Sequence, residues 1–337
     1  MKKLMKPLSL ACVLLLLTAC GPAAPAEEPE QPEPLRLEAL RLELSRNDLP
    51  AETLAQAVRD LPPLLKSALE AQGAAAETVT VSIGASVQAT VQAVREGGVD
   101  VAILPAGAFA ALEAPPRLLL AAGPAAPAED GEPRPGAPAL ICAAPTENGR
   151  ALAEKARTDG LTWEDLSGVR WGVLEEGSLL GRQAVDLWLW DRCDGETSAH
   201  LILSVYDSYE DLIRAAAAEA IDVLPLWDGV RRDWAEAWTL DPSRTDGRGV
   251  RGLGRARSLE EELPVLGETE RLYTSVAVTG EEDGVLTDSR FAAALAAALE
   301  AVRAEPAAAA LGPYSYAPAE DGALDPQRRL AGLSAVS

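Results

Sequence analysis

The side chains that could carry out covalent chemistry are few in this sequence and poorly placed for it. His200 is the only histidine, so a nucleophilic triad would have to use it, and no Gly-x-Ser-x-Gly turn precedes a suitable helix. Paired carboxylates occur in charge runs such as 260–262 and 281–283, which are typical of solvated loops. Walker and dinucleotide-binding motifs are missing. We therefore expect neither an enzyme nor a cofactor, and enzymatic activity is the less favoured alternative.

The four cysteines differ in what their positions allow. Cys12 lies inside an apolar N-terminal run and Cys20 directly follows that run, which leaves Cys142 and Cys193 for the rest of the chain. These two could form a disulfide worth roughly 4 kcal/mol for a loop of this length, or they could be two buried free thiols. Cys193 and His200 have no second close-spaced pair of ligands beside them, so we expect no metal site.

The first twenty residues have the pattern of an export signal. Three lysines in residues 1–6 precede an apolar run at 8–19, which is shorter than the roughly 20 residues that a membrane-spanning helix needs. The run ends in Leu-Thr-Ala-Cys at 17–20, which resembles the lipobox of bacterial lipoproteins. This resemblance implies a signal peptide over 1–19, a lipid on Cys20 and an extracytoplasmic protein that this lipid anchors to the cell membrane. An ordinary secretory signal with a chance cysteine is the alternative.

Composition separates a tether from a globular part. Residues 20–34 are mainly Pro, Ala, Glu, Gly and Gln, which cannot build a core, so we expect a disordered tether. The formal net charge of the chain is −22, which argues against nucleic acid or an anionic lipid surface as a partner. A net charge does not exclude a local pocket for an anion.

The globular part reads as a two-lobed α/β protein. About 300 residues follow the tether, which is more than one hydrophobic core usually serves. Apolar and charged residues alternate over 35–44, which predicts a strand, and helical spacing over 50–71 with Pro62 and Pro63 predicts a kinked or two-piece helix. Strands and helices then alternate, which predicts βαβ units and parallel strands. The other predicted strands are 78–83, 99–104, 117–121, 139–144, 169–174, 201–205, 221–226 and 271–279, and the other predicted helices are 87–96, 161–166, 182–190, 208–220 and 288–304.

Three blocks of sequence suggest a family. They are TVSIGASVQATVQAVREGGVDVAILPAGAFAAL at 80–112, LTWEDLSGVRWGVLEEGSLLGRQAVDLWL at 161–189, and the helix and strand region of 206–228. In this order they resemble segments of the phosphate, phosphite and phosphonate substrate-binding proteins of ABC transporters. The resemblance implies a two-lobed type 2 periplasmic-binding-protein fold, in which each lobe is a mixed sheet flanked by helices and the ligand cleft lies between the lobes.

The same resemblance indicates how the chain divides into lobes and where a ligand would bind. We expect one lobe from residues 35–138 and 271–337 and the other from 139–270. Helix starts after strands offer unpaired N–H groups and a favourable dipole to an oxyanion. A helix cap or a packed turn is the alternative role for each candidate. The candidate ligand contacts are Ser86, Gln88, Phe109, Ser178, Asp207, Ser208 and Asp228.

Two departures from the family pattern affect the expected ligand. Residues 177–181 read GSLLG where the family has GSTSG, so only Ser178 keeps its hydroxyl. The lost donors would cost roughly 1–3 kcal/mol each in a desolvated cleft. A histidine that the family often places near 207–210 is missing, whereas Asp228 matches an aspartate that meets an amine in aminophosphonate binders. We expect a phosphonate or another oxyanion as the ligand, and a cationic, zwitterionic or aromatic solute is the open alternative.

These observations predict a membrane-anchored solute-binding lipoprotein of an ABC importer. Its expected partners are a small-molecule ligand, an ABC permease and the membrane through the lipid, and we expect a monomer. The main alternative is a binding-protein-like lipoprotein that acts as a sensor or interaction module without transport. All seven tryptophans lie between Trp163 and Trp238, and core packing explains them better than a ligand-binding wall.

Overall fold

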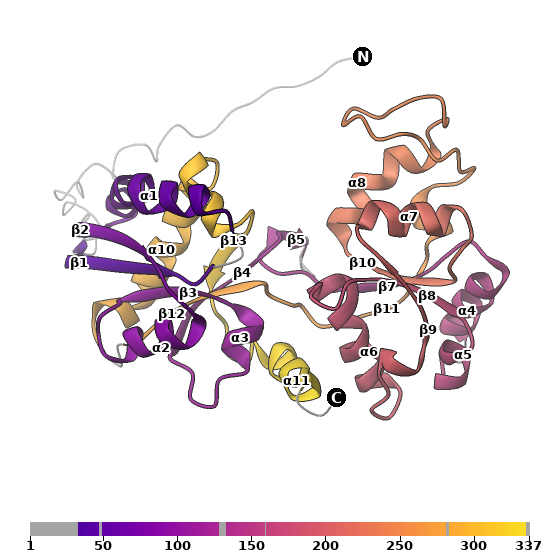
Figure 1. Cartoon of the computed structure of the whole chain (residues 1–337), viewed down its shortest axis with the longest axis horizontal. Helices are drawn as coiled ribbons and strands as arrows, with labels where there is room; N and C mark the ends of the chain where they lie inside the picture. The colour runs from indigo at the N-terminus through magenta and orange to yellow at the C-terminus, as the bar shows by residue number, and fades with distance from the viewer. Residues whose placement is uncertain (1–32, 47–48, 128–132, 159, 281–282, 335–337) are drawn as a thin grey trace, which may run out of the picture. The chain divides into compact units, whose positions relative to one another are not determined.

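The computed structural model describes residues 33–46, 49–127, 133–158, 160–280 and 283–334 (Figure 1). The predicted signal peptide, Cys20 and most of the predicted tether lie outside the described residues. Within the described part, no helix combines the length and the apolar character that crossing a bilayer would require.

The first sheet has six strands in the order β13-β4-β12-β3-β1-β2 (Figure 1). β1 pairs in parallel with β2 and β3, whereas β12 is antiparallel to β3 and β4, so the sheet is mixed. β1 has the bounds predicted from its alternating pattern, and Leu40, Leu42 and Leu44 are buried. The strands are β1 (Leu35–Leu44), β2 (Ala74–Ile83), β3 (Val101–Pro105), β4 (Arg117–Gly123), β12 (Ser275–Thr279) and β13 (Ser315–Pro318).

Helices cover both faces of the first sheet because consecutive side chains of its strands point to opposite faces. In β3, Ile103 packs in the core under α1 and α10, whereas Ala102 and Leu104 pack in the core under α2 and α3. α1 is a single helix that includes Pro62 and Pro63, so the expected two-piece form is not adopted. The helical segments here are α1 (Ala51–Ala71), α2 (Val87–Arg95), α3 (Ala106–Ala110), η3 (Val285–Thr287), α10 (Ser289–Val302), η4 (Pro306–Leu311) and α11 (Asp325–Ser334).

The second sheet repeats this plan in the order β11-β7-β10-β8-β9. β8 is parallel to β9 and β10, and β7 is antiparallel to β10 and β11. In both sheets, three parallel strands therefore lie next to an antiparallel strand, which is β12 beside β3 in the first sheet and β7 beside β10 in the second. The strands are β7 (Leu140–Ala143), β8 (Arg170–Leu174), β9 (Ile202–Tyr206), β10 (Val223–Leu226) and β11 (Val265–Glu268).

The second sheet is also covered on both faces. In Figure 1, α7 and α8 lie on one side of the sheet and α4, α5 and α6 on the other, which agrees with two separate apolar cores. The expected α/β class, with mixed sheets flanked by helices, is confirmed. The helical segments are α4 (Glu147–Thr158), α5 (Trp163–Ser167), η1 (Leu179–Gln183), α6 (Ala184–Arg192), η2 (Ser198–His200), α7 (Tyr209–Ala217), α8 (Asp228–Thr239) and α9 (Leu259–Glu262).

The two cysteines of the described part are buried free thiols. Cys142 on β7 belongs to the core beneath α7 and α8, whereas Cys193 belongs to the core on the opposite face. The sheet separates them, so the disulfide that the sequence left open is not formed. Burial raises the pKa of the Cys142 thiol to about 12 and also raises the pKa of Cys193.

The chain passes from one sheet to the other after β4 and returns after β11. The first passage includes the strand pair of β5 (Ala126–Pro127) and β6 (Pro133–Arg134). An antiparallel bridge joins the passages at Ala137 and Leu272, and the Arg271 guanidinium donates to carbonyls of 126, 127 and 134–136.

Candidate functional site

Three parallel strands bring the candidates of the second sheet to one edge. β10, β8 and β9 are neighbours in that order, so the loops that follow them leave from the same edge, where α/β sheets commonly bind ligands. Asp228 follows β10 at the start of α8, Ser178 follows β8, and the pair Asp207 and Ser208 follows β9.

Ser178 caps a helical turn that begins before the helix predicted at 182–190. Its Oγ accepts a hydrogen bond from the Gly181 N–H at 3.2 Å, and its carbonyl accepts from the N–H groups of Arg182 and Gln183 at 3.0 Å. The turn is the π-helix η1, which continues directly into α6. A Cβ on Gly181 would lie 2.6 Å from Leu174 and 2.7 Å from Ser178 Oγ, so this position has room only for glycine.

The two leucines of the GSLLG turn are used in packing. Leu180 is buried and Leu179 is half-buried, and both belong to an apolar cluster that includes Ala184 and Leu187 of α6. The change from hydroxyl to apolar side chains therefore has a structural explanation. It also leaves Ser178 as the hydroxyl that the turn itself can offer to a ligand.

Tyr209 is a neighbour of Ser178 that sequence reasoning did not name as a candidate. Its hydroxyl is buried, lies beside Ser178 and has no hydrogen bond of normal geometry among the described residues. Burial raises the pKa of this phenol, and the neighbouring Ser178 hydroxyl opposes that rise, so the group is a proton donor at neutral pH. The signal was present in the sequence, because Tyr209 falls in the interval where the family often has its histidine.

The other candidates of this edge have different roles. The Ser208 hydroxyl accepts from the Asp211 N–H at 3.1 Å and donates to the Asp211 carboxylate at 2.7 Å, which is the helix-cap alternative. Asp207 is exposed and Asp228, the first residue of α8, is half-buried. Neither carboxylate has a hydrogen-bond or ion-pair partner in the described part of the chain, so both are available to a ligand.

Ser86 lies at the corresponding edge of the first sheet. Its Oγ accepts from the Ala89 N–H at 3.1 Å and so caps α2. The cavity beside it has a volume of about 530 Å³, a size that suits a small molecule. Arg46 supplies a positive charge there. The lining residues are Ser45, Arg46, Ser86, Val87, Pro105, Thr274, Ser275 and Tyr314.

The remaining two candidates do not line this cavity. Gln88 is exposed on α2. Phe109 is only 1% exposed and packs with Val91, Leu104 and Val276 in the core of the first sheet. Its ring presents almost no surface to a ligand, which corresponds to the packed-turn alternative.

Charges at the helix starts differ in a way that restricts where an anion could bind. α7 has Glu210 and Asp211 in its first turn, and α8 has Asp228. The first turns of η1 and α2 contain no acidic residue. An oxyanion is therefore favoured at Ser178 and Ser86, and the acidic starts favour a cationic group.

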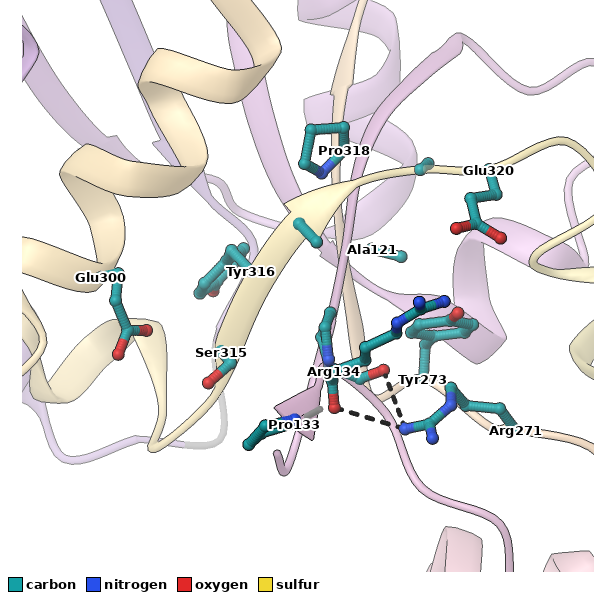
Figure 2. A pocket seen from close by; sticks show the side chains of 13 residues that line it. Ala121, Pro133, Arg134, Arg271, Tyr273, Glu300, Ser315, Tyr316, Pro318 and Glu320 are labelled. Atoms are coloured by element: carbon teal, nitrogen blue, oxygen red, sulfur yellow. Dashed lines mark hydrogen bonds between the residues drawn. The ribbon is translucent and has the colours of Figure 1, made fainter. Parts of the chain in front are cut away.

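A larger cavity of about 1120 Å³ lies beside β13 and the two passages between the sheets (Figure 2). Arg134, Arg271, Glu300 and Glu320 line it, so positive and negative side chains balance. Figure 2 shows the Arg271 guanidinium hydrogen bonded to backbone carbonyls of 134 and 135, which is a structural role. None of the sequence-predicted site residues lines this cavity. In the described residues, no cluster of His, Cys, Asp and Glu could hold a metal ion.

Comparison with known proteins places the chain in a family. The family model of the phosphonate periplasmic substrate-binding proteins of ABC transporters matches residues 49–322. No curated protein matches the sequence.

Solved structures also resemble the chain at low sequence identity. XAC2383 from Xanthomonas citri bound to ATP is 14% identical, with 89% of this chain and 98% of that chain covered and a TM-score of 0.44. PhnD1 from Prochlorococcus marinus in complex with methylphosphonate is 12% identical, with 88% and 97% covered and a TM-score of 0.40. The aliphatic sulphonate binding protein SsuA from Escherichia coli is 15% identical, with 89% and 92% covered and a TM-score of 0.41. Because the family model covers most of its length, this chain belongs to the phosphonate periplasmic substrate-binding proteins of ABC transporters.

Proposed function

We propose that this protein is a lipid-anchored solute-binding component of an ABC importer and that it captures a small solute through an oxyanion group. Membership of the substrate-binding family supports a small-molecule ligand, an ABC transporter as partner and an extracytoplasmic location. The oxyanion would bind at the Ser178 turn, with the Ser86 edge of the first sheet contributing from the other lobe as it closes.

The observation that carries this proposal is the arrangement of Ser178 and Tyr209. Ser178 Oγ already accepts from the Gly181 N–H, and the neighbouring phenol can donate to its second lone pair. The hydrogen of the serine hydroxyl is then left for a ligand oxygen. At a helix start the N–H groups of Leu179 and Leu180 have no intrahelical acceptor, so they can add two more donors.

The carboxylates of the same edge suggest what the rest of the ligand carries. Asp228 is half-buried and, like Asp207, makes no ion pair within the described residues. An ammonium group at the far end of the ligand would pair with Asp228 and remove the cost of a half-buried free carboxylate. A zwitterion with an oxyanion and an amine therefore fits this edge better than a simple anion.

A ligand screen by thermal unfolding tests the proposal. We expect 2-aminoethylphosphonate to raise the Tm more than methylphosphonate or inorganic phosphate, because it carries an amine that can pair with Asp228. Any ligand present at 100 times its Kd stabilises the folded protein by about 2.7 kcal/mol. Ser178→Ala should weaken binding of all three, and Asp228→Asn should weaken only the amine-bearing ligand. Unchanged affinity in both variants would remove the assignment of this site.

Lipid anchoring needs a separate test, since Cys20 lies outside the described residues. In cells that process lipoproteins, Cys20→Ala should move the protein from the membrane fraction to the soluble fraction, whereas Cys12→Ala should leave it at the membrane. A Cys20→Ala protein that stays in the membrane fraction would contradict the anchor.

The second candidate function is a sensor or interaction module without transport. It is favoured by the loss of two hydroxyl donors at the GSLLG turn. A wild-type protein whose Tm responds to none of the three probes would support this reading over solute capture.

A further inference from the structure

The apolar cluster behind the Ser178 turn joins four segments that are far apart in the sequence. Leu179 and Leu180 of the turn pack with Ala137 of the first passage and Leu272 of the second. Leu330 of α11 belongs to the same cluster, and Leu333 packs against it. The turn that would hold the ligand thus rests on both passages and on the C-terminal helix.

The first end of α11 is fixed to the elements of the first sheet. Leu324, just before the helix, is 1% exposed and packs with Phe109 and Val276. The buried Gln327 donates from Nε2 to the carbonyl of Tyr273 at 3.1 Å. α11 also packs against α3, which lies near it in Figure 1.

The second half of α11 contacts the helix that continues from the Ser178 turn. Leu330 is 8% exposed and lies in the cluster with Ala184 and Leu187 of α6. Arg329 Nη2 lies 2.7 Å from Glu270 Oε1 and 3.6 Å from Asp191 Oδ2, the latter near the end of α6. One short helix therefore links the first sheet to the ligand turn.

We infer that α11 positions the Ser178 turn, with Leu330 as the positioning residue. The inference rests on the proposed function, and it explains the leucines of GSLLG as the surface through which α11 supports the turn. A side chain that never touches the ligand would then control how well Ser178 and the backbone N–H groups are aligned for it.

Hydrogen exchange tests the inference without any ligand. The N–H groups of Gly181, Arg182 and Gln183 all donate to Ser178, so their exchange reports whether the turn is closed. Leu330→Ala should speed exchange of the peptide 178–184 by about tenfold. The matched control is Leu286→Ala, which empties a site of similar burial, 7% exposed, in the core of the first sheet.

A control variant and a rescue variant distinguish a local effect on the turn from a general loss of stability. We expect Leu286→Ala to leave exchange of 178–184 unchanged, and Leu330→Met, which refills the cluster, to restore slow exchange. Exchange that rises equally in the two alanine variants would overturn the inference.

A titration with 2-aminoethylphosphonate then separates the two proposals. If the wild type binds it, Leu330→Ala should weaken binding by about tenfold and Leu286→Ala should leave binding unchanged. Equal affinities of the two alanine variants would overturn the positioning role of Leu330. If the wild type binds none of the three probes, the proposed function fails, while the exchange experiment still decides whether α11 supports the turn.

Discussion

The two sheets contain the same ion-pair arrangement in different surroundings. In each, an aspartate just before the third parallel strand accepts from the backbone N–H, Nε and Nη2 of an arginine on the first parallel strand. The pairs are Arg41 with Asp100 and Arg170 with Asp222. Asp222 is 1% exposed and also accepts from Thr146 and Asn148, whereas Asp100 is 15% exposed.

The edges of the two sheets differ more than their frameworks do. The edge of the first sheet presents Ser86 and Arg46 without an acidic first turn, and the edge of the second sheet presents Ser178 and Tyr209 between acidic helix starts. The repeated strand order therefore provides a common scaffold. The loops after the strands decide which charge each edge can bind.

The largest expected difference is in the stability lost when each of the two aspartates is replaced by alanine. Asp222→Ala should lower the free energy of unfolding by about 3 kcal/mol, because it removes the acceptor of the buried Thr146 hydroxyl and of the Arg170 backbone N–H. Asp100→Ala should cost about 1 kcal/mol, as a solvated pair does. Urea denaturation of both variants measures the difference, and equal losses would show that the two pairs are equivalent.

The same comparison predicts a response to acid. Burial works against ionisation of Asp222, but hydrogen bonds from Arg170, Thr146 and Asn148 outweigh it and lower its pKa from 3.8 to about 2. The stabilisation is therefore complete above pH 3.8 and is lost as the pH falls through 2. Since one pKa unit corresponds to 1.36 kcal/mol, about 2 kcal/mol is involved. Unfolding measured between pH 5 and 2 should show a shallower loss in Asp222→Asn, and parallel curves would exclude this carboxylate as the cause.

The two glycines of the GSLLG turn should differ in how much stability is lost when each is replaced by alanine. Gly181→Ala should destabilise the protein by about 2 kcal/mol through overpacking against Leu174. Gly177→Ala should be nearly neutral, because a Cβ there meets nothing within 4 Å. Thermal unfolding of the two variants provides the test. Similar Tm values would mean that the turn can relax around the added methyl group.

The smallest expected effect on stability is that of replacing Ser208, which distinguishes a serine that only caps a helix from one that also binds ligand. Ser208→Ala should cost about 1 kcal/mol of stability by removing the cap of α7, without changing the affinity for 2-aminoethylphosphonate. Ser178→Ala removes a cap of the same kind but should also weaken binding. Calorimetric titration of both variants checks this, and a loss of affinity in Ser208→Ala would bring that hydroxyl into the site.

Much of the fold was predictable because the spacing of apolar residues along the sequence indicates which side chains are buried. The alternation in 35–44 predicted β1, and the helical spacing of apolar residues over 50–71 predicted α1. The segments that were missed, among them α4, β11, β13 and α11, are short or polar, so their patterns are weak. β13 is an edge strand of four residues, stabilised by pairing with β4 rather than by its own sequence.

The candidate site was predictable in outline only. Ser178 was named because its turn matches the family's binding turn, and Ser86 was named from its position at a helix start. Both residues cap helices that follow strands. The role of Ser208 as a cap, the burial of Phe109 and the hydroxyl of Tyr209 beside Ser178 depend on which helix packs on which strand. A single sequence without structure cannot supply those contacts.

The sequence by itself determined the alternation of strands and helices, the family and the loops in which a ligand site would lie, because these depend on local pattern and spacing. Only the tertiary structure decided that Cys142 and Cys193 face opposite sides of a sheet and that the leucines of GSLLG rest on α11. Strand order determines the first outcome, because it places the two thiols in cores on opposite faces of the sheet. Long-range packing determines the second, because it brings the turn against a helix far along the chain.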